Sequence, residues 1–564
     1  MVVEALDAEK VKFVFGLPGD MQLYDALNEY PDVKPIQTRN ESSGVFMAYA
    51  YAKLTGEPGV CYGTLGPGVA QMVAGILETY SAALPMVIPC PSPSQLTDGK
   101  GAFQENDQVS MLSGMTKWSH KVTRPEKIPW AMRRAFSIAT NGKPGPVFLD
   151  FPKDVGNAEI SRSSLPEYVP ADRSIRTRPD FERVKRVADL LLESERPVIV
   201  AGGGAISSKA FSEVVELAEL LAIPILTTPC GRGIVSEDHP LAVGLVGLYR
   251  TQVGKRLYEE ADVLVGLGTR FEEFQSGGWE YFPSNAKYVQ VDVDPWEIGK
   301  NWIPTVALVG DLKLTLRDII DVVKEKWKKT QNIKSRARII EKTKREYEAE
   351  VDSECAPKGD VLRVKMIVKG INRIFGANTI LVNENGSLDL WSYYYPYYRV
   401  LNTLGCVAPA EQTCMGIGVA AAIGAKIAVP TKNVVCTTGD GAFQMQMQEM
   451  ATAAQYKAGV TWLIFNNFGL GWPKYVWQLL APGRQVAVDY AVVPEFEKVA
   501  QNTKCFGLRV ERPNEIDDAL RSALESNKEG IPAVLNCIVK PMDYNKFFKE
   551  YHMLWGASRD SISA

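Results

Sequence analysis

Residues 439–467 read GDGAFQMQMQEMATAAQYKAGVTWLIFNN, and this stretch decides the fold prediction. The apolar run VVCTT precedes it, a helical segment follows the Gly-Asp-Gly turn, and the apolar run TWLIF ends at Asn466 and Asn467. Strand, glycine turn, helix and strand make one parallel βαβ unit. We therefore expect Asp440 and Asn467 to meet at the carboxyl ends of the two strands, where open α/β sheets bind ligands.

The side chains at this edge suit a hard divalent cation that also holds phosphate. Asp440 supplies a carboxylate and Asn467 an amide oxygen, both of which are oxygen ligands for such a cation. Gly439 and Gly441 allow the backbone to approach an anion closely. An ordinary βαβ turn with a chance pair of Asn residues is the alternative. The spacing and the Asn pair resemble the diphosphate-binding motif of the thiamine diphosphate (ThDP) enzymes.

Composition indicates a large globular enzyme of a reducing compartment. At roughly 150 residues per domain, the 564 residues predict three or four domains. The formal net charge of −3 favours neither nucleic acid nor an anionic membrane as a partner. The nine Cys form no CxxC pair, and we see no signal peptide or long apolar span, so we expect a cytoplasmic protein with reduced thiols. The three scattered His argue against a His-based metal site or a Ser-His-Asp triad.

The chain divides into three α/β blocks, and we predict three consecutive doubly wound parallel-sheet domains. The first covers residues 1–160, the second 183–330 and the third 359–540, which leaves 541–564 as a C-terminal tail. Short apolar strands that end in Gly or acidic turns alternate with helix-like segments in these blocks. A polar linker containing Pro follows the first block, and a highly charged segment, predicted to be a solvated helix, precedes the third.

Glu41 carries the second signature. The residues after it, in ESSGVFMAYAYAK, predict a helix that begins near Glu41. The helix dipole stabilises a carboxylate at such a position, so simple capping is the alternative. The motifs around it are GLPGD (16–20), RNE (39–41), GEPGV (56–60), GTLGPG (63–68) and GAFQE (101–105). This order resembles the acetolactate synthase-like branch of the ThDP enzymes, and the likeness continues through TKW (116–118), GKPGPVFLDFPKDV (142–155), DPWEIGKN (294–301) and GDLK (310–313).

The resemblance implies a pyrimidine-binding first domain, a middle domain and a diphosphate-binding third domain. Glu41 matches the carboxylate that is hydrogen-bonded to N1′ of the cofactor and switches its pyrimidine to the imino form, which removes the C2 proton. Met415 matches the apolar wedge that bends the cofactor, although Met is also an ordinary core residue. The backbone near Thr413 and Met415 is then expected to pair with the pyrimidine edge.

The resemblance also implies a cofactor anchor in the third domain. Asp440 and Asn467 bind Mg²⁺ by their side chains, and Gly469 binds it by its carbonyl. The N–H groups of Gly441 and Ala442 meet the diphosphate at the start of a helix. In this family the cofactor lies between the first domain of one subunit and the third domain of another, so a homodimer or homotetramer is expected.

The positions that set the substrate depart from biosynthetic acetolactate synthase. That enzyme typically has Met, Gln and Trp in the loop after the Asn pair, and here Trp472, Tyr475 and Val476 stand in those places. RNE (39–41) and LVNENGSLDLW (381–391) are more similar to the 2-hydroxyacyl-CoA lyases and oxalyl-CoA decarboxylases, and the tail is loosely similar to theirs. We therefore expect a ThDP-dependent carbon–carbon lyase that cleaves a 2-hydroxyacyl-CoA reversibly to an aldehyde or ketone plus formyl-CoA. An acetolactate synthase-like 2-oxoacid carboligase or decarboxylase is one alternative, and a catalytically silent ThDP-fold binding or regulatory protein is another.

Candidate residues for the acyl site gather in two loops and the tail. We predict that the site is lined or closed by Phe103, Gln104, Glu105, Trp472, Lys474, Tyr475, Trp477 and Trp555. A packed interface loop is the alternative for the residues after the Asn pair. The tail over 541–564 is a candidate active-site lid, and its alternative is a frayed terminus.

The middle block carries a weaker nucleotide signal. Gly202, Gly203 and Gly204 follow a strand and could admit the adenosine diphosphate group of CoA or FAD, although GGG falls short of a full dinucleotide fingerprint. Arg270 could meet a phosphate or form a salt bridge, and Asp292 could bind a ribose or cap the next turn. The predicted ligands are thus ThDP and Mg²⁺, with ADP, CoA or FAD as candidates for the middle domain.

Overall fold

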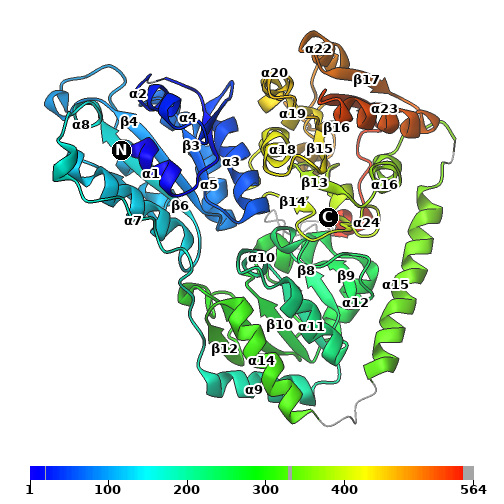
Figure 1. The fold of residues 1–564 in the computed structure, drawn as a ribbon. Helices are drawn as coiled ribbons and strands as arrows, with labels where there is room; N and C mark the ends of the chain where they lie inside the picture. The colour runs from blue at the N-terminus through cyan, green and yellow to red at the C-terminus, as the bar shows by residue number, and fades with distance from the viewer. Residues whose placement is uncertain (20, 328–332, 358, 551–564) are drawn as a thin grey trace.

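Three parallel sheets organise the chain. The structure is a computed structural model that describes residues 1–19, 21–327, 333–357 and 359–550. Each sheet has six strands and is packed with helices, which confirms the prediction of three successive α/β domains. In Figure 1 the first domain (blue to cyan) and the third (yellow to red) stand side by side above the middle domain (green). Among the described residues, no helix has the length and apolar character needed to cross a membrane.

The first sheet has the strand order β2-β1-β3-β4-β6-β5. Its strands are β1 (Phe13–Gly16), β2 (Lys34–Gln37), β3 (Gly59–Tyr62), β4 (Met86–Ser92), β5 (Trp118–Lys121) and β6 (Pro146–Pro152). Its helices are α1 (Val2–Ala8), α2 (Met21–Ala26), α3 (Glu41–Thr55), α4 (Pro67–Gln71), α5 (Val73–Ala82), α6 (Gln108–Leu112), α7 (Ile128–Thr140) and α8 (Lys153–Gly156). The central strands β3, β4 and β6 are buried along their whole length, as expected for a parallel sheet covered on both faces.

The third sheet repeats this topology. Its order is β14-β13-β15-β16-β18-β17, which becomes 2-1-3-4-6-5 when β13 to β18 are counted from one. Its strands are β13 (Thr379–Asn383), β14 (Cys406–Val407), β15 (Asn433–Gly439), β16 (Thr461–Asn466), β17 (Phe506–Val510) and β18 (Ala533–Ile538). Its helices are α16 (Val364–Phe375), α17 (Leu390–Tyr393), α18 (Ile417–Ala428), α19 (Asp440–Gln446), α20 (Met450–Gln455), α21 (Gly471–Leu480), α22 (Phe496–Asn502), α23 (Ile516–Lys528) and α24 (Lys546–Glu550).

The middle sheet has a different order, β12-β11-β10-β7-β8-β9. Its strands are β7 (Pro197–Ala201), β8 (Ile225–Thr227), β9 (Ala242–Leu245), β10 (Val263–Leu267), β11 (Lys287–Asp292) and β12 (Val306–Val309). Its helices are α9 (Phe181–Glu193), α10 (Gly203–Ser207), α11 (Phe211–Leu221), α12 (Gln252–Glu259), α13 (Glu273–Ser276) and α14 (Leu312–Lys326). The strand order reverses between β7 and β10, which creates the switch point where such sheets bind nucleotides.

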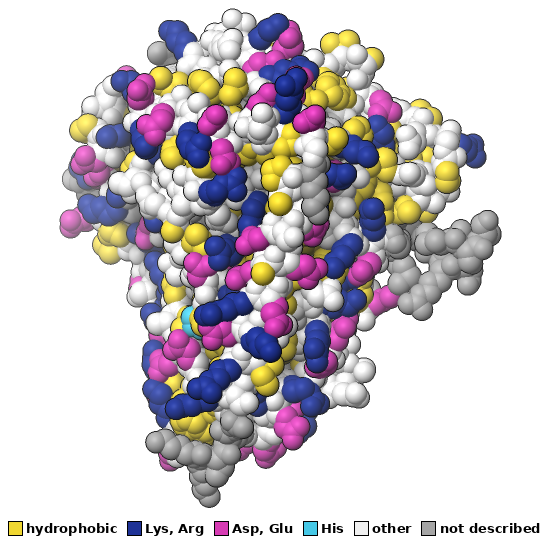
Figure 2. Space-filling model, turned by 90° about the vertical axis from the view of Figure 1, so that its right-hand side faces the viewer, with side chains coloured by type: hydrophobic (Ala, Val, Ile, Leu, Met, Phe, Trp, Pro, Cys, Tyr) yellow, Lys and Arg dark blue, Asp and Glu magenta, His cyan; other side chains and the backbone are white. Residues whose placement is uncertain are grey.

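The charged segment before the third domain forms α15 (Ile333–Cys355), which runs along the edge of the molecule in Figure 1. Ile340, Tyr347 and Val351 are buried on one side of this helix. Lys, Arg, Asp and Glu side chains are interspersed over the face shown in Figure 2, so charges of both signs are mixed there. The predicted solvated helix is therefore present, but it also packs one apolar face against the protein.

Helices α3 and α18 join the first and third domains. Their buried residues belong to one continuous apolar core. Both helices are rich in small residues, and Gly424 of α18 lies against the backbone of Met47 in α3. A Cβ atom at Gly424 would stand 2.2 Å from the carbonyl oxygen of Met47, so only glycine permits this approach.

We expect Gly424→Ala to lower the free energy of unfolding by about 1–3 kcal/mol, because the added methyl group overpacks a backbone contact. Thermal and denaturant unfolding would measure the change. Gly114→Ala is the control, since its Cβ would meet no described atom within 4 Å, and its effect should stay within about 0.5 kcal/mol. Equal stabilities for the two variants would contradict the close crossing.

Candidate active site

The predicted cation ligands meet at the carboxyl edge of the third sheet. Strands β15 and β16 pair in parallel, with Gly439 opposite Phe465, so Asp440 and Asn467 follow neighbouring strand ends. The amide oxygen of Asn467 lies 3.0 Å from Oδ1 of Asp440 and 2.9 Å from the carbonyl oxygen of Gly469. The N–H of Gly469 donates to Oδ2 of Asp440 at 3.0 Å.

Three oxygen atoms that face one another at these distances suit a divalent cation. Without a cation, the opposite orientation of the Asn467 amide would be stable, because its nitrogen would then donate to both neighbours. Neighbouring ligands of an octahedral Mg²⁺ with bonds of about 2.1 Å stand about 3.0 Å apart. Burial raises the pKa of Asp440 to about 6, so a cation would also offset the cost of burying its charge. The donor set therefore fits Mg²⁺.

Space for an anion adjoins these oxygens. Gly439 ends β15 and directly precedes α19, the helix that begins at Asp440. Apart from Gly439 itself and its chain neighbours Thr438 and Asp440, no described heavy atom lies within 4 Å of the point where a Cβ of Gly439 would stand. The first N–H groups of a helix have no backbone carbonyl partner within it, and those of Gly441 and Ala442 are in this position.

Glu41 is the first residue of α3 and is buried. Its helix is capped by Asn40, whose side-chain oxygen accepts the N–H of Ser42 at 2.8 Å. Glycines of the GTLGPG motif make room for its carboxylate. A Cβ on Gly68 would lie 2.9 Å from Oε1 of Glu41, and one on Gly63 would lie 3.3 Å from its Cγ. Because Asn40 already caps the helix, α3 does not need the Glu41 carboxylate as its N-cap.

Gln446, at the end of α19, brings the two signatures together within one chain. Its Nε2 donates to Oγ of Ser42 at 2.9 Å, and its Oε1 accepts the hydroxyl of Ser43. Gln446 also packs on the turn after Met415, because a Cβ on Gly416 would stand 2.7 Å from its Cγ. The start of α3, the turn at Met415 and the helix of Asp440 therefore adjoin one another. The two-subunit arrangement of the cofactor site stays a prediction.

The turn at Thr413 and Met415 is held by residues that the sequence analysis did not identify as site residues. Nδ2 of Asn385 donates to the carbonyl of Thr413 at 2.6 Å. Glu384 accepts the N–H groups of Gly416 at 3.1 Å and Gly418 at 2.8 Å. Burial raises the pKa of Glu384 to about 8. Both residues belong to the LVNENG motif, whose pattern indicates a family resemblance but predicts no site role for them.

A second carboxylate reaches this turn from the first domain. The Oε1 of Glu78 accepts the N–H of Ala410 at 2.6 Å, and its Oε2 accepts the N–H of Cys414 at 3.0 Å. Met415 is half-buried. No sequence motif marked Glu78, because its partners lie more than 330 positions away.

The aromatic residues predicted to line the acyl site pack against α24. Trp472 contacts Phe548 with ring centroids 5.0 Å apart, and Tyr475 contacts Phe548 at 4.7 Å. Trp472 also meets Phe274 of the middle domain at 5.6 Å. Trp472 and Tyr475 lie in the helix α21 and not in the predicted loop, because the segment after Leu470 continues as ten helical residues. The described part of the tail thus covers this helix. Trp555 lies outside the described residues.

The other candidate substrate residues are dispersed. Lys474 forms an ion pair with Asp489. Trp477 is partly exposed and Phe103 is 82% exposed, so Phe103 does not line an enclosed site within this chain. Glu105 accepts the N–H groups of Gly99 and Ala102 in its own loop, and Gln104 adopts a positive φ of 61° beside Gly66.

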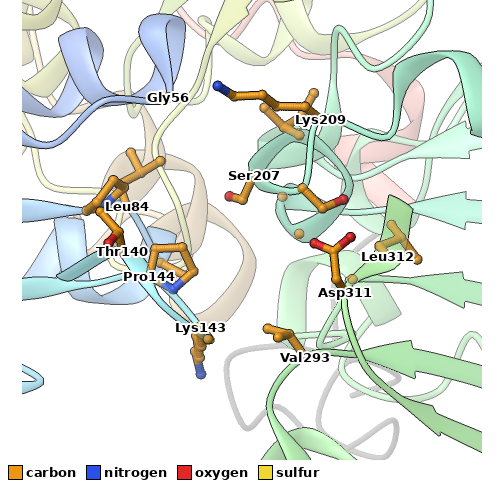
Figure 3. Close-up of a pocket in the computed structure, with 18 of the residues that line it drawn as sticks. Gly56, Leu84, Thr140, Lys143, Pro144, Ser207, Lys209, Val293, Asp311 and Leu312 are labelled. Atoms are coloured by element: carbon orange, nitrogen blue, oxygen red, sulfur yellow. The ribbon is translucent and has the colours of Figure 1, made fainter. Parts of the chain in front are cut away.

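The nucleotide candidates gather in a cavity of about 760 Å³ between the first and middle domains. Its walls include Gly203, Gly204, Arg270 and Asp292. Gly202 is not among the residues that line the cavity, and it packs on the backbone of Gly268. In Figure 3, side chains of the first domain, such as Leu84, Thr140, Lys143 and Pro144, face Ser207, Lys209, Val293 and Asp311 of the middle domain.

Arg270 and Asp292 both line this cavity, and each also makes a contact within the protein, so ligand binding and a structural role are both compatible with the structure. Arg270 forms an ion pair with Glu272 at 2.6 Å while lining the cavity. Asp292 accepts the N–H of Asp294 at 2.9 Å, and burial raises its pKa to about 6.

Comparisons with known proteins agree with this architecture. Family models described as the N-terminal TPP binding, central and C-terminal TPP binding domains of thiamine pyrophosphate enzymes match residues 1–111, 184–319 and 384–537. The chain is 37% identical over 563 residues to the "Probable acetolactate synthase large subunit" of Methanocaldococcus jannaschii, covering 96% of this chain and 92% of that protein. It is 31% identical over 530 residues to the "Acetolactate synthase large subunit" of Haemophilus influenzae, covering 93% and 91%. The same name belongs to a relative from Corynebacterium glutamicum, 30% identical over 545 residues, covering 95% and 86%.

Fold and site together define a thiamine diphosphate-dependent enzyme. The chain belongs to the thiamine pyrophosphate enzyme family. The named relatives correct the substrate prediction. They favour the acetolactate synthase-like alternative over the 2-hydroxyacyl-CoA lyase, and an acyl-CoA substrate has no support from them. The residues in RNE and LVNENG that resembled the lyases have structural roles here: Asn40 caps α3, and Glu384 and Asn385 hold the turn at Thr413.

Asp440→Ala should abolish the thermal stabilisation that ThDP and Mg²⁺ give the protein. A ligand present at one hundred times its dissociation constant stabilises the native state by about 2.7 kcal/mol. Differential scanning calorimetry would measure this difference. Asp518→Ala, at an exposed position of α23, is the control and should keep the full stabilisation. Retention of that stabilisation by Asp440→Ala would refute the assignment of this edge to the cation.

Proposed function

We propose that this protein is a ThDP- and Mg²⁺-dependent carboligase that joins two molecules of a 2-oxo acid with loss of carbon dioxide, as acetolactate synthase does with pyruvate. The observation that carries the proposal is the set of three oxygens at Asp440, Asn467 and Gly469, adjoined through α19 by the start of α3 and the turn at Met415. The relatives named acetolactate synthase support the carboligase over the other reactions of this family.

Different residues of the chain would bind the two ends of the cofactor. Asp440, Asn467 and Gly469 would hold Mg²⁺, and the N–H groups at the start of α19 would hold the diphosphate. Glu41 would hold a proton shared with the pyrimidine, from a buried position where solvent does not compete. The bound cofactor supplies a carbon nucleophile and an electron sink for breaking and making carbon–carbon bonds.

The aromatic wall would exclude water from the reacting carbonyl groups. Trp472 and Tyr475 take the places where acetolactate synthases typically carry Met and Gln, and both pack on the described part of the tail. The acceptor is the second of the two molecules that are joined. Large aromatic rings offer it fewer polar groups than a Gln side chain does. We therefore propose that the acceptor is a small 2-oxo acid, held mainly by apolar contact and by the cofactor.

We also propose that the cavity of the middle domain accepts the adenosine phosphate part of a second ligand. It opens at the carboxyl ends of β7, β10 and β11, next to the reversal of strand order. Lys209 reaches its wall from the loop after α10, as Figure 3 shows. Candidate ligands are ADP, FAD and CoA.

Glu41→Gln should retain most ThDP binding and lose turnover, because the amide keeps the shape of the side chain but cannot share a proton in the same way. Exchange of the cofactor C2 proton, measured by NMR on the loaded protein, should slow by orders of magnitude. Glu29→Gln, at an exposed position of the first domain, should exchange at the wild-type rate. A wild-type rate in Glu41→Gln would assign activation to another group.

An activity panel at fixed ThDP and Mg²⁺ tests the reaction. It compares pyruvate with several 2-hydroxyacyl-CoAs and oxalyl-CoA and identifies products by mass spectrometry. We expect two pyruvate molecules to yield one acetolactate and one carbon dioxide, and no CoA ester to turn over. Formyl-CoA from a CoA ester, without acetolactate from pyruvate, would restore the lyase. Tight ThDP binding without C2–H exchange or any product would identify a silent member of the fold.

A further inference from the structure

The segment Val488–Tyr490 lies beside the metal-binding loop. The N–H of Leu470 donates to the carbonyl of Val488 at 2.8 Å, and the N–H of Tyr490 donates to the carbonyl of Phe468 at 3.0 Å. Between these two hydrogen bonds, Gly469 and Asp489 face each other in an antiparallel bridge. The loop that carries the Gly469 carbonyl is therefore one strand of a short two-stranded ladder, and Tyr490 is on the other.

This ladder directs the phenol of Tyr490 to the start of α19. A Cβ on Gly441 would lie 3.1 Å from the hydroxyl oxygen of Tyr490 and 3.0 Å from Cδ2 of Leu470. These two side chains form a roof over Gly441, and a larger residue there would collide with them. Glycine at this position therefore allows the phenol to approach the start of the helix this closely.

The hydroxyl of Tyr490 stands where a negative ligand would arrive. Burial and then the negative charge of Asp440 raise the pKa of this phenol. The ring is half-exposed, which leaves the hydroxyl accessible from the site. Within the described ranges, this hydroxyl makes no hydrogen bond to another residue.

We propose that Tyr490 is a further cofactor-binding residue, whose hydroxyl donates to an oxygen of the diphosphate held at the N–H groups of Gly441 and Ala442. The inference rests on the proposed ThDP site and adds to it a side-chain donor from outside the βαβ unit. A hydrogen bond from a hydroxyl to a charged oxygen is among the stronger ones in proteins. Because one ladder fixes both Tyr490 and Gly469, the phosphate donor and the metal-binding carbonyl keep a constant separation.

The test is isothermal titration calorimetry of the full chain with ThDP and, separately, with inorganic pyrophosphate, each at saturating Mg²⁺. Tyr490→Phe keeps the ring and the backbone ladder and removes only the hydroxyl. We expect its Kd to rise by about tenfold or more for both ligands, because a hydrogen bond to a charged group is lost. Tyr80→Phe, at an exposed tyrosine of α5, removes a tyrosine hydroxyl away from the site; it is the control and should keep both wild-type Kd values.

The outcomes distinguish a failure of the Tyr490 assignment from a failure of the proposed ThDP site. Wild-type Kd values for both ligands in Tyr490→Phe would overturn the role of Tyr490 and leave the ThDP site standing. A weaker affinity for ThDP with an unchanged affinity for pyrophosphate would also overturn it, because the contact would then lie away from the diphosphate. A wild-type chain that binds neither ligand would overturn the ThDP site itself. The unfolding temperature of the unliganded variant, expected to match that of the wild type, shows that the ladder is intact.

Discussion

The crossing of α3 and α18 is the contact on which the rest of the site depends. The two helices belong to different sheets, yet their residues share one apolar core. Gly424 allows the backbones to touch at Met47, and this closeness fixes where the first turn of α3 lies relative to the third domain. The proposed proton sharing by Glu41 requires hydrogen-bond distance to the cofactor, so the placement of this helix start matters for the proposed function. Close helix packing restricts that placement.

Buried carboxylates do much of the positioning around this crossing. Glu78 and Glu384 accept backbone N–H groups on both sides of the turn at Met415. Glu449 accepts the N–H of Arg39, just before the start of α3. A buried charge is costly unless hydrogen bonds compensate it. Displacing one of these loops would break the hydrogen bonds to its buried carboxylate, so the loop is stabilised in its position. This differs from the edge at Asp440, Asn467 and Gly469, where three oxygens face one another and suit a cation.

The sequence predicted the parts of the site that lie within one supersecondary unit. Asp440 and Asn467 were placed correctly at one edge because parallel strands on either side of a helix end side by side. Tyr490, Glu78 and Gln446 were not foreseen, since their contacts depend on how distant segments fold back, and no periodicity records that. Trp472 and Tyr475 pack on α24, a contact with the chain end that the local sequence pattern does not predict. The relatives favour the acetolactate synthase-like alternative over the predicted lyase. Residues such as Asn40, Glu384 and Asn385 hold cofactor-binding loops, so differences there say little about the carbonyl compound.

The first and third sheets share one strand order, so α3 and α18, which each follow the second strand of their sheet, are equivalent elements. Their contact is an internal counterpart of the two-fold contact by which identical subunits pair. The two halves have diverged where they meet. One presents the carboxylate of Glu41 at its helix start, and the other presents the thioether of Met415 just before its helix. A chemically asymmetric ligand can thus be held by a nearly symmetric scaffold, because the two equivalent helices present different side chains at their starts.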